Sequence, residues 1–171
     1  ARQIFSNHFL TSNSVNPNLN VRVQKDRPKK FITHNRIDLM PKIRYVKDYI
    51  KQDFQMHTIN DYELCVGALT NFTYKEPGNI NKQSMEDYYI HFNKLISSIE
   101  NNGFDVARSV VPVGYNNTLL DGSHRVASAY VCDSPIYYVK FPELKIKYDW
   151  KFFASRTVSI KTVEKWLLDY L

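Results

Sequence analysis

Residues 119–130 read LLDGSHRVASAY, and this stretch decides how the middle of the chain is expected to fold. Two leucines end an apolar run, Asp-Gly-Ser-His-Arg interrupts it, and small apolar residues follow. The chain has only five glycines, and one of them, Gly122, stands in the interruption. Glycine reaches backbone conformations that other residues avoid, so the pattern predicts a tight turn from a short strand into a helix.

Such a turn is suited to hold an anion. The first N–H groups of a helix have no acceptor within the helix, and the helix dipole adds partial positive charge there. Ser123, His124 and Arg125 supply further donors, while Gly122 leaves room for a ligand. Asp121 can coordinate Mg²⁺ or orient a hydroxyl group. The alternative is structural: Asp121 or Ser123 caps the helix, and Arg125 pairs with a surface acid.

Apolar spacing and turn residues predict the elements around this stretch. Ser84 and Asp87 stand at capping-box spacing before a helix, and Asp38 and Asn60 or Asp61 are the expected caps of two earlier helices. The chain is therefore expected to be a small α+β domain with a mixed sheet and helical material in front of it. The expected helices cover residues 38–55, 60–69, 85–101, 123 onward and 159–171, the strands 109–113, 118–120 and 136–141, and a loop 71–83.

Length, composition and charge limit the possible functions. A chain of 171 residues with 43% hydrophobic residues suits one domain, alone or with an extension. A formal net charge of +6 favours anionic partners. The two cysteines form no CxxC pair, so a disulfide framework or a structural zinc site is not expected, and the reducing cytoplasm is the expected location. No apolar run approaches the ~20 residues that span a bilayer.

Residues 21–30, VRVQKDRPKK, hold five basic residues against one acid. One interpretation is a solvated strand and turn that ends near Pro28. The other is a basic arm that contacts phosphates, as in proteins that bind nucleic acid. The sequence leaves both open.

Residues 72–141 resemble the ParB/sulfiredoxin superfamily. The resemblance rests on three phrases in the order that the superfamily has them, namely ISSIENNGF at a helix end, SVVPV as a strand, and LLDGSHRVASA as a strand leading into a G-x-x-R helix. It implies a small mixed-sheet, nucleotide-binding domain over residues 71–171. Residues 1–70 are then a basic arm and a helical extension.

The branches of this superfamily differ at the turn. Sulfiredoxins carry Gly-Cys-His-Arg, and Ser123 lacks the thiolate that their chemistry needs. The DNA-partitioning branch carries Gly-Glu-Arg-Arg and a helix-turn-helix domain, for which the 30 residues after residue 141 leave no room. The free-serine kinases carry Asp-Gly-His-His-Arg, which is the nearest to DGSHR. That resemblance implies that residues 122–125 bind nucleotide phosphates, that Asp121 assists the chemistry, and that Glu76 is the base.

A second resemblance is to bacterial proteins of surface-polysaccharide gene clusters, in which an R-x-D-L…K phrase precedes the same turn. Here the phrase is Arg36-Ile37-Asp38-Leu39, with Lys42 after it. Arg36, Asp38 and Lys42 are therefore candidates for substrate binding. Lys82, in the loop before the 85–101 helix, is a further candidate, unless it only solvates the surface.

These observations support three hypotheses. The first is an ATP-dependent kinase with Mg²⁺ at Asp121, which phosphorylates a small hydroxyl compound such as an amino acid or a sugar of surface-glycan biosynthesis. The second is a ParB-like module that binds nucleic acid or switches with a nucleotide without catalysis. The third is a relative without activity that uses the turn for structure or for binding a partner. The sequence does not name the phosphate acceptor, the nucleobase or the oligomeric state.

Overall fold

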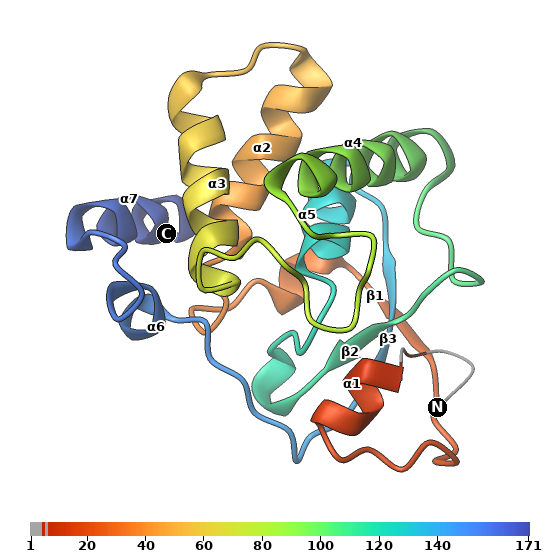
Figure 1. The fold of residues 1–171 in the computed structure, drawn as a ribbon. Coiled ribbons are helices and arrows are strands. Elements are labelled where there is room, and N and C mark those ends of the chain that lie inside the picture. Colours follow the sequence, from red (N-terminus) through yellow and green to blue (C-terminus); the bar gives the residue numbers. More distant parts are fainter. Residues whose placement is uncertain (1–4, 6) are drawn as a thin grey trace.

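The computed structural model describes residue 5 and residues 7–171, and these form an α+β fold, as expected. Helices lie on both sides of a small mixed sheet (Figure 1). Within the described residues, the α-helices are α1 (Asn7–Ser12), α2 (Leu39–Lys51), α3 (Met56–Leu69), α4 (Met85–Asn102), α5 (Ser123–Val131), α6 (Trp150–Ala154) and α7 (Ile160–Tyr170). The strands are β1 (Gln24–Asp26), β2 (Val111–Val113) and β3 (Ile136–Lys140), and the 3₁₀ turns are η1 (Pro28–Phe31) and η2 (Tyr115–Asn117).

The sheet has the order β1-β3-β2. β1 runs antiparallel to β3, with Lys25 opposite Tyr137, and β2 runs parallel to β3, with Pro112 opposite Val139. Proline cannot donate a backbone hydrogen bond, which confines it to sheet edges. Pro112 accordingly lies on the edge strand β2.

α5 is the central helix. It packs against α2, α4 and η1, and these elements cover one face of the sheet with a large apolar core (Figure 1). Alternate residues of β3 point to the opposite face, where Val139 joins a smaller cluster that contains Phe9 and Leu10 of α1. α5 therefore packs within the large core, on one face of the sheet.

Residues 1–70 and 71–171, which the sequence analysis separates, share the large core. β1 pairs with β3, and α2 packs against α5. The helical extension is thus part of the scaffold around the DGSHR turn. Residues 1–4 and 6 of the expected basic arm lie outside the described residues.

Several expected boundaries differ from the structure. α2 ends at Lys51 because Gln52 takes a left-handed conformation with φ 53°, and α3 begins at Met56, four residues before the expected start. The Asp38 side chain does not cap α2, because its carboxylate binds Arg36 and Lys42 instead. Neither Asn60 nor Asp61 caps α3, because both lie inside that helix. The strand expected at 118–120 is only an isolated bridge between Leu119 and Val113.

Two expectations about helix ends are confirmed, and two elements were not expected. α4 starts with the full Ser84/Asp87 capping box and ends at Gly103. α1 and α6 are 6 and 5 residues long. Such short helices carry little periodic signal, because two turns hold too few apolar positions to define a face.

α7 is fastened to α2 and α3 by an ionic cluster, which we call the Asp61 cluster. Asp61 Oδ2 accepts from Arg44 Nη1 at 2.8 Å and from Lys165 Nζ at 3.0 Å, and Arg44 also pairs with Asp169. The cluster consists of two cations and two carboxylates, namely Arg44, Lys165, Asp61 and Asp169.

Candidate anion site at the start of α5

The DGSHR stretch forms the tight turn that the sequence predicts. Gly122 has φ +82°, and its N–H donates to Asp121 Oδ1 at 2.5 Å. α5 begins at Ser123, and its first internal acceptor is the Gly122 carbonyl, which binds Val126 N at 3.0 Å. No side chain caps this end, so the backbone N–H groups of residues 123–125 have no acceptor among the described residues.

Beneath this turn lies a buried ionic group, which we call the Asp38 cluster: Arg36, Asp38 and Lys42. Arg36 holds Asp38 in a bidentate pair, with Nε–Oδ1 at 2.8 Å and Nη2–Oδ2 at 2.9 Å. Lys42 Nζ donates to Asp38 Oδ2 at 2.7 Å and to Ser123 Oγ at 2.8 Å. Arg36 Nη1 donates to the carbonyl of Leu119. The cluster therefore contacts both the residue before the turn and the first residue of α5.

The Asp38 cluster carries more positive than negative charge. Burial alone raises the pKa of Asp38, but the charges of Arg36 and then Lys42 outweigh burial and hold that pKa well below its usual range. The carboxylate is therefore ionised, and it faces two cations whose side chains are at most 3% exposed. An excess buried charge is costly unless an opposite charge lies close to it. This excess positive charge lies next to the unpaired N–H groups of the first turn of α5.

Arg125 folds back over the turn. Its Nη1 donates to the Val110 carbonyl at 3.2 Å, and its Nη2 lies 3.6 Å from Asp121 Oδ2. The positive φ of Gly122 favours glycine, and a Cβ atom there would come within 2.7 Å of Arg125 Nη2, so any other residue would also displace the guanidinium. The Asp121 side chain is 60% exposed, which leaves its carboxylate accessible to a ligand.

Glu76 and Lys82 lie in the connection between α3 and α4, and their charges act on Arg125 and His124, respectively. Glu76 accepts from Lys82 Nζ at 3.2 Å and from Asn79 Nδ2 at 2.5 Å. Burial lowers the pKa of Arg125, and the charges of Asp121 and Glu76 act in the opposite direction. Every residue that the sequence singled out therefore lies in one region: Arg36, Asp38, Lys42, Glu76, Lys82, Asp121, Gly122, Ser123, His124 and Arg125.

His124 is held by aromatic residues that the sequence analysis did not name. Its Nε2 lies 3.1 Å from the hydroxyl oxygen of Tyr62, and its ring packs edge-on against Phe92 with centroids 4.5 Å apart. Burial, followed by the charges of Lys42 and Lys82, lowers the pKa of His124 well below its ordinary value. His124 is therefore neutral at pH 7 and offers a hydrogen bond rather than a charge. Tyr62 lies on α3, 62 positions away in sequence, and nothing local in the chain relates the two residues.

The side chains fit a nucleotide phosphate with Mg²⁺. Among the described residues, no group of three His, Cys, Asp or Glu side chains is placed to hold a metal ion by itself. Mg²⁺ bound with a nucleotide needs only one or two carboxylates, because phosphate oxygens and water supply the other ligands. The exposed Asp121 carboxylate beside the glycine turn meets that requirement.

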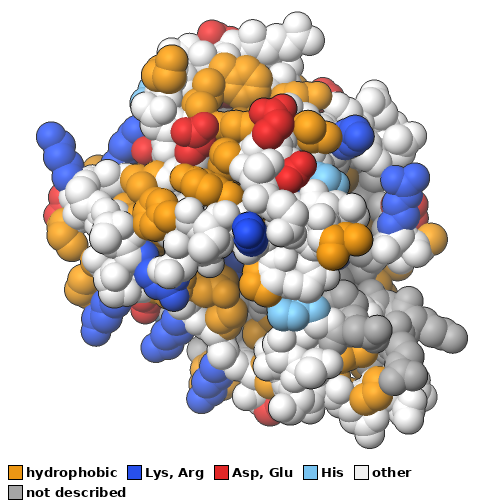
Figure 2. All heavy atoms as spheres, in the orientation of Figure 1, with side chains coloured by type: hydrophobic (Ala, Val, Ile, Leu, Met, Phe, Trp, Pro, Cys, Tyr) orange, Lys and Arg blue, Asp and Glu red, His pale blue; other side chains and the backbone are white. Residues whose placement is uncertain are grey.

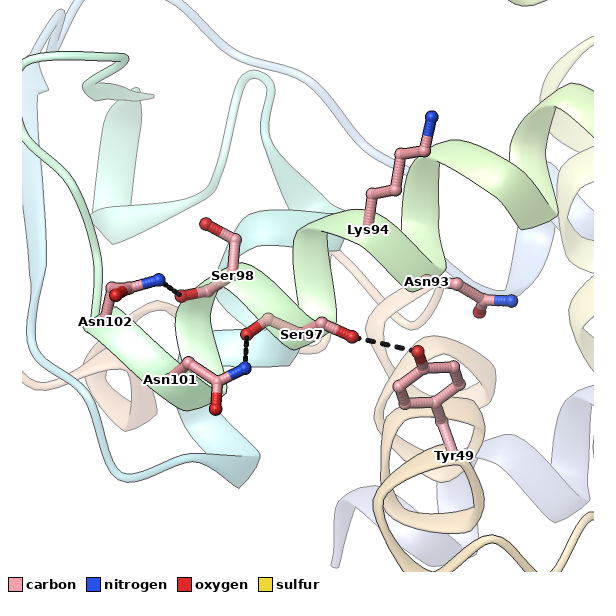
Figure 3. A pocket seen from close by; sticks show the side chains of 7 residues that line it. All are labelled: Tyr49, Asn93, Lys94, Ser97, Ser98, Asn101 and Asn102. Carbon is pink, nitrogen blue, oxygen red and sulfur yellow. Dashed lines mark hydrogen bonds between the residues drawn. The ribbon is translucent and has the colours of Figure 1, made fainter.

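A separate cavity of about 410 Å³ lies along α4. Tyr49 of α2 and hydroxyl and amide side chains of α4 line it, and the Tyr49 hydroxyl lies 2.9 Å from Ser97 Oγ (Figure 3). Asn101 and Asn102 bond backward to carbonyls of their own helix. None of the candidate residues around the DGSHR turn lines this cavity.

On the face drawn in Figure 2, several Lys and Arg side chains lie near one another at the lower left, and others stand singly. In the arm, Arg27 pairs with Asp133 at 2.6 Å, and Lys30 pairs with Asp26. Two of the five basic residues of this arm therefore pair with acidic side chains of the protein itself, which weakens its interpretation as an element that contacts phosphates.

Comparison of the chain with protein-family models, with curated proteins and with solved structures gave no match in any of the three. Among the described residues, no helix combines the length and the apolar character that crossing a bilayer requires.

Proposed function

We propose that the start of α5 binds the phosphates of ATP with Mg²⁺, and that the chain is a kinase for a small hydroxyl compound, an amino acid or a sugar of surface-glycan biosynthesis. One observation carries this proposal. Two buried cations share one carboxylate directly beneath the unpaired N–H groups of residues 123–125. A bound anion would compensate the excess charge and pair these donors at once.

The count of charges around the turn agrees with this. The four cations Arg36, Lys42, Lys82 and Arg125 face the three carboxylates Asp38, Glu76 and Asp121, which leaves one positive charge in excess. His124 adds no charge, because burial keeps it neutral. A phosphate that is partly neutralised by Mg²⁺ suits such a site better than several unshielded phosphates do.

The proposal gives each side chain a role. Arg125 and the N–H groups of α5 hold phosphate oxygens, Gly122 leaves the backbone accessible, and Asp121 binds Mg²⁺. ATP supplies the phosphoryl group that the substrate hydroxyl accepts. Glu76 takes the proton of that hydroxyl once Lys82 leaves it for the phosphates. The resemblance of DGSHR to the turn of the free-serine kinases also supports this assignment.

Titration of the protein with ATP, ADP, CTP and GTP, each with and without Mg²⁺, tests the proposal by thermal shift. A ligand that binds only the native state adds about 2.7 kcal/mol of stability at a hundredfold excess over its dissociation constant. We expect ATP with Mg²⁺ to stabilise the wild type and to lose this effect in Arg125→Ala. Arg108→Ala is the matched control, because Arg108 is an exposed arginine outside the site.

Three results would contradict the kinase. If no nucleotide stabilises the wild type, the turn has a structural role. If duplex DNA or RNA binds instead, with log K falling against log salt by about 0.9 per phosphate contact, the chain is the ParB-like module. A nucleotide that binds without any transfer to amino acids or sugars favours the switch without catalysis.

A further inference from the structure

Tyr62 is fully buried in the core, and among the described residues its hydroxyl has one hydrogen-bond partner, Nε2 of His124 at 3.1 Å. The rings of Tyr45 and Phe92 lie 4.6 and 5.3 Å from the Tyr62 ring. The hydroxyl therefore sits among aromatic rings and has one hydrogen-bond partner among the described residues. Burial raises the pKa of Tyr62, so the phenol keeps its proton.

Only one placement of the protons satisfies this pair. If Nε2 of the neutral imidazole carried the hydrogen, Nε2 would donate to the Tyr62 oxygen, and the Tyr62 hydroxyl hydrogen would remain in the apolar core without an acceptor. If Tyr62 donates to Nε2, the Tyr62 hydroxyl is paired, and the hydrogen on Nδ1 is not buried without a partner, because Nδ1 is not among the described side-chain atoms that are shut off from solvent and unpaired. The second arrangement places the hydrogen of the imidazole on Nδ1.

Nδ1 is the ring nitrogen next to Cγ, so it lies closer to its own backbone than Nε2 does. That backbone is the first turn of α5, where the N–H groups of residues 123–125 have no acceptor. Nδ1 itself has no hydrogen-bond partner among the described residues. We propose that Tyr62 is a positioning residue: it fixes His124 as the Nδ1–H tautomer and thereby adds a neutral donor to the anion site.

This inference rests on the proposed function for its ligand, but not for the tautomer. The charged groups that act on His124 come from several elements: Lys42 from α2, Arg36 and Asp38 before it, and Lys82 from the connection between α3 and α4. Three of these four are cations, and they oppose a second proton on the ring. The donor therefore persists through the neutral pH range, whereas a charged histidine would lose its contribution as pH rises.

The tautomer is measured first, without ligand. Two-bond ¹H–¹⁵N correlation spectra of ¹⁵N-labelled protein show which ring nitrogen carries the hydrogen. We expect Nδ1–H in the wild type and a change in the His124 signals toward a mixture of tautomers in Tyr62→Phe. Tyr45→Phe is the matched control, because Tyr45 is buried in the same aromatic group but donates to Asn93 Oδ1. A hydrogen on Nε2 in the wild type would overturn the inference.

Affinity for ATP with Mg²⁺ is measured second, by calorimetry. The side-chain amide of asparagine lies near the place of Nδ1, and that of glutamine reaches the place of Nε2. We expect His124→Asn to retain affinity within about threefold and His124→Gln to lose about tenfold, the effect of one hydrogen bond. Tyr62→Phe should lose severalfold, and Tyr45→Phe should lose nothing.

The two measurements separate two kinds of failure. If ATP does not bind the wild type, the proposed function and the role of Nδ1–H as a phosphate donor both fall, while the tautomer is decided by the spectra. If ATP binds but His124→Gln equals His124→Asn, or Tyr62→Phe binds as the wild type does, the proposed function survives and the positioning role of Tyr62 is wrong. Circular dichroism of each variant confirms that it is folded.

Discussion

The Asp38 cluster and the Asp61 cluster both involve α2, and both bind two cations to a central carboxylate, yet they differ in balance and burial. In the Asp61 cluster a second carboxylate, Asp169, completes the pairing, and the side chains are 11–41% exposed. In the Asp38 cluster no second carboxylate of the described residues makes direct contact, and the side chains are at most 3% exposed. The same residue types therefore face very different environments within one helix's length.

The two clusters differ in what they need. The charge-balanced Asp61 cluster lies between helices, needs no ligand, and links α7 to α2 and α3. Stability alone does not explain the unbalanced Asp38 cluster in the core, because a buried charge without a counter-charge is costly. Under the function proposed above, its position below the open end of α5 allows it to attract an anion. The predictions that follow test this contrast, beginning with the largest effect.

Asp38→Asn should be the most damaging substitution. It leaves the two buried cations Arg36 and Lys42 without a counter-charge, and removal of one partner from a buried pair costs about 3–5 kcal/mol. Asp61→Asn, the matched substitution, should cost about 1 kcal/mol, because solvent screens its partners and Arg44 keeps Asp169. The measurement is urea unfolding of both variants. Equal losses would mean that the two clusters do not differ as argued.

Lys42→Met should cost less stability than Asp38→Asn but should weaken the binding of an anion. The substitution removes the excess charge but leaves Asp38 its bidentate pair with Arg36, so the cost in stability should be about 1–2 kcal/mol, well below that of Asp38→Asn. The affinity for ATP with Mg²⁺ should fall about tenfold, since one nearby cation is lost. Calorimetry and urea unfolding check both parts. Unchanged affinity would remove the excess charge from the account of anion binding.

The region above the Asp38 cluster should also make stability depend on pH. The pKa of His124 is lowered in the folded state by burial first and by nearby cations second, while the unfolded value is about 6.5. Below about pH 6.5, His124 binds a proton in the unfolded chain but stays neutral in the folded chain. The contribution of the neutral His124 to folding stability is therefore complete above that pH and is lost as pH falls. One proton corresponds to at most about 1.4 kcal/mol per pH unit.

Unfolding of the wild type and of His124→Asn between pH 7.5 and 5.0 measures this slope. The variant should lack the part of the slope that begins near pH 6.5. Identical slopes would indicate that His124 becomes protonated in the folded protein. A second acid loss belongs to Asp38: its folded pKa is depressed, so its contribution is complete above about pH 4 and declines as pH falls further.

Much of the fold follows from local pattern. The Ser84/Asp87 box, the Asn102-Gly103 end and the apolar spacing of residues 85–101 predict α4 almost to the residue, and Gly122 predicts the turn before α5. The errors at Asp61 and Leu119 fall where a partner distant in sequence is involved. Asp61 has the residue type of a helix cap, but it lies inside α3 and binds Lys165 of α7. Asp38 has the same residue type, but its carboxylate binds Arg36 and Lys42, which are near in sequence. Leu119 looks like strand, but Arg36 takes its carbonyl.

Some residues of the candidate site follow from local pattern and others do not. Residues 121–125 are adjacent in the chain, so the predicted turn brings them together. Arg36, Asp38 and Lys42 enter through their resemblance to an R-x-D-L…K phrase, and the structure places Lys42 on Ser123. Tyr62 and Phe92 carry no such mark, because an aromatic residue at helical spacing reads as core. Their contact with His124 depends on how α3 and α4 pack, which no short stretch of the sequence contains.

The smallest expected effect belongs to the rim of the Asp61 cluster. Lys165→Met removes one exposed cation from Asp61, which keeps its bond to Arg44, so the loss in stability should be about 0.5 kcal/mol or less. It should also leave ATP affinity unchanged, in contrast with Lys42→Met, although both substitutions remove a lysine bound to a carboxylate. Raising the salt concentration should shrink the Lys165 effect and leave the Lys42 effect on stability nearly constant, because salt screens exposed pairs far more than buried ones. If Lys165→Met weakened ATP binding as much as Lys42→Met does, net charge alone would explain both results, and the position of Lys42 beneath the start of α5 would carry no information about function.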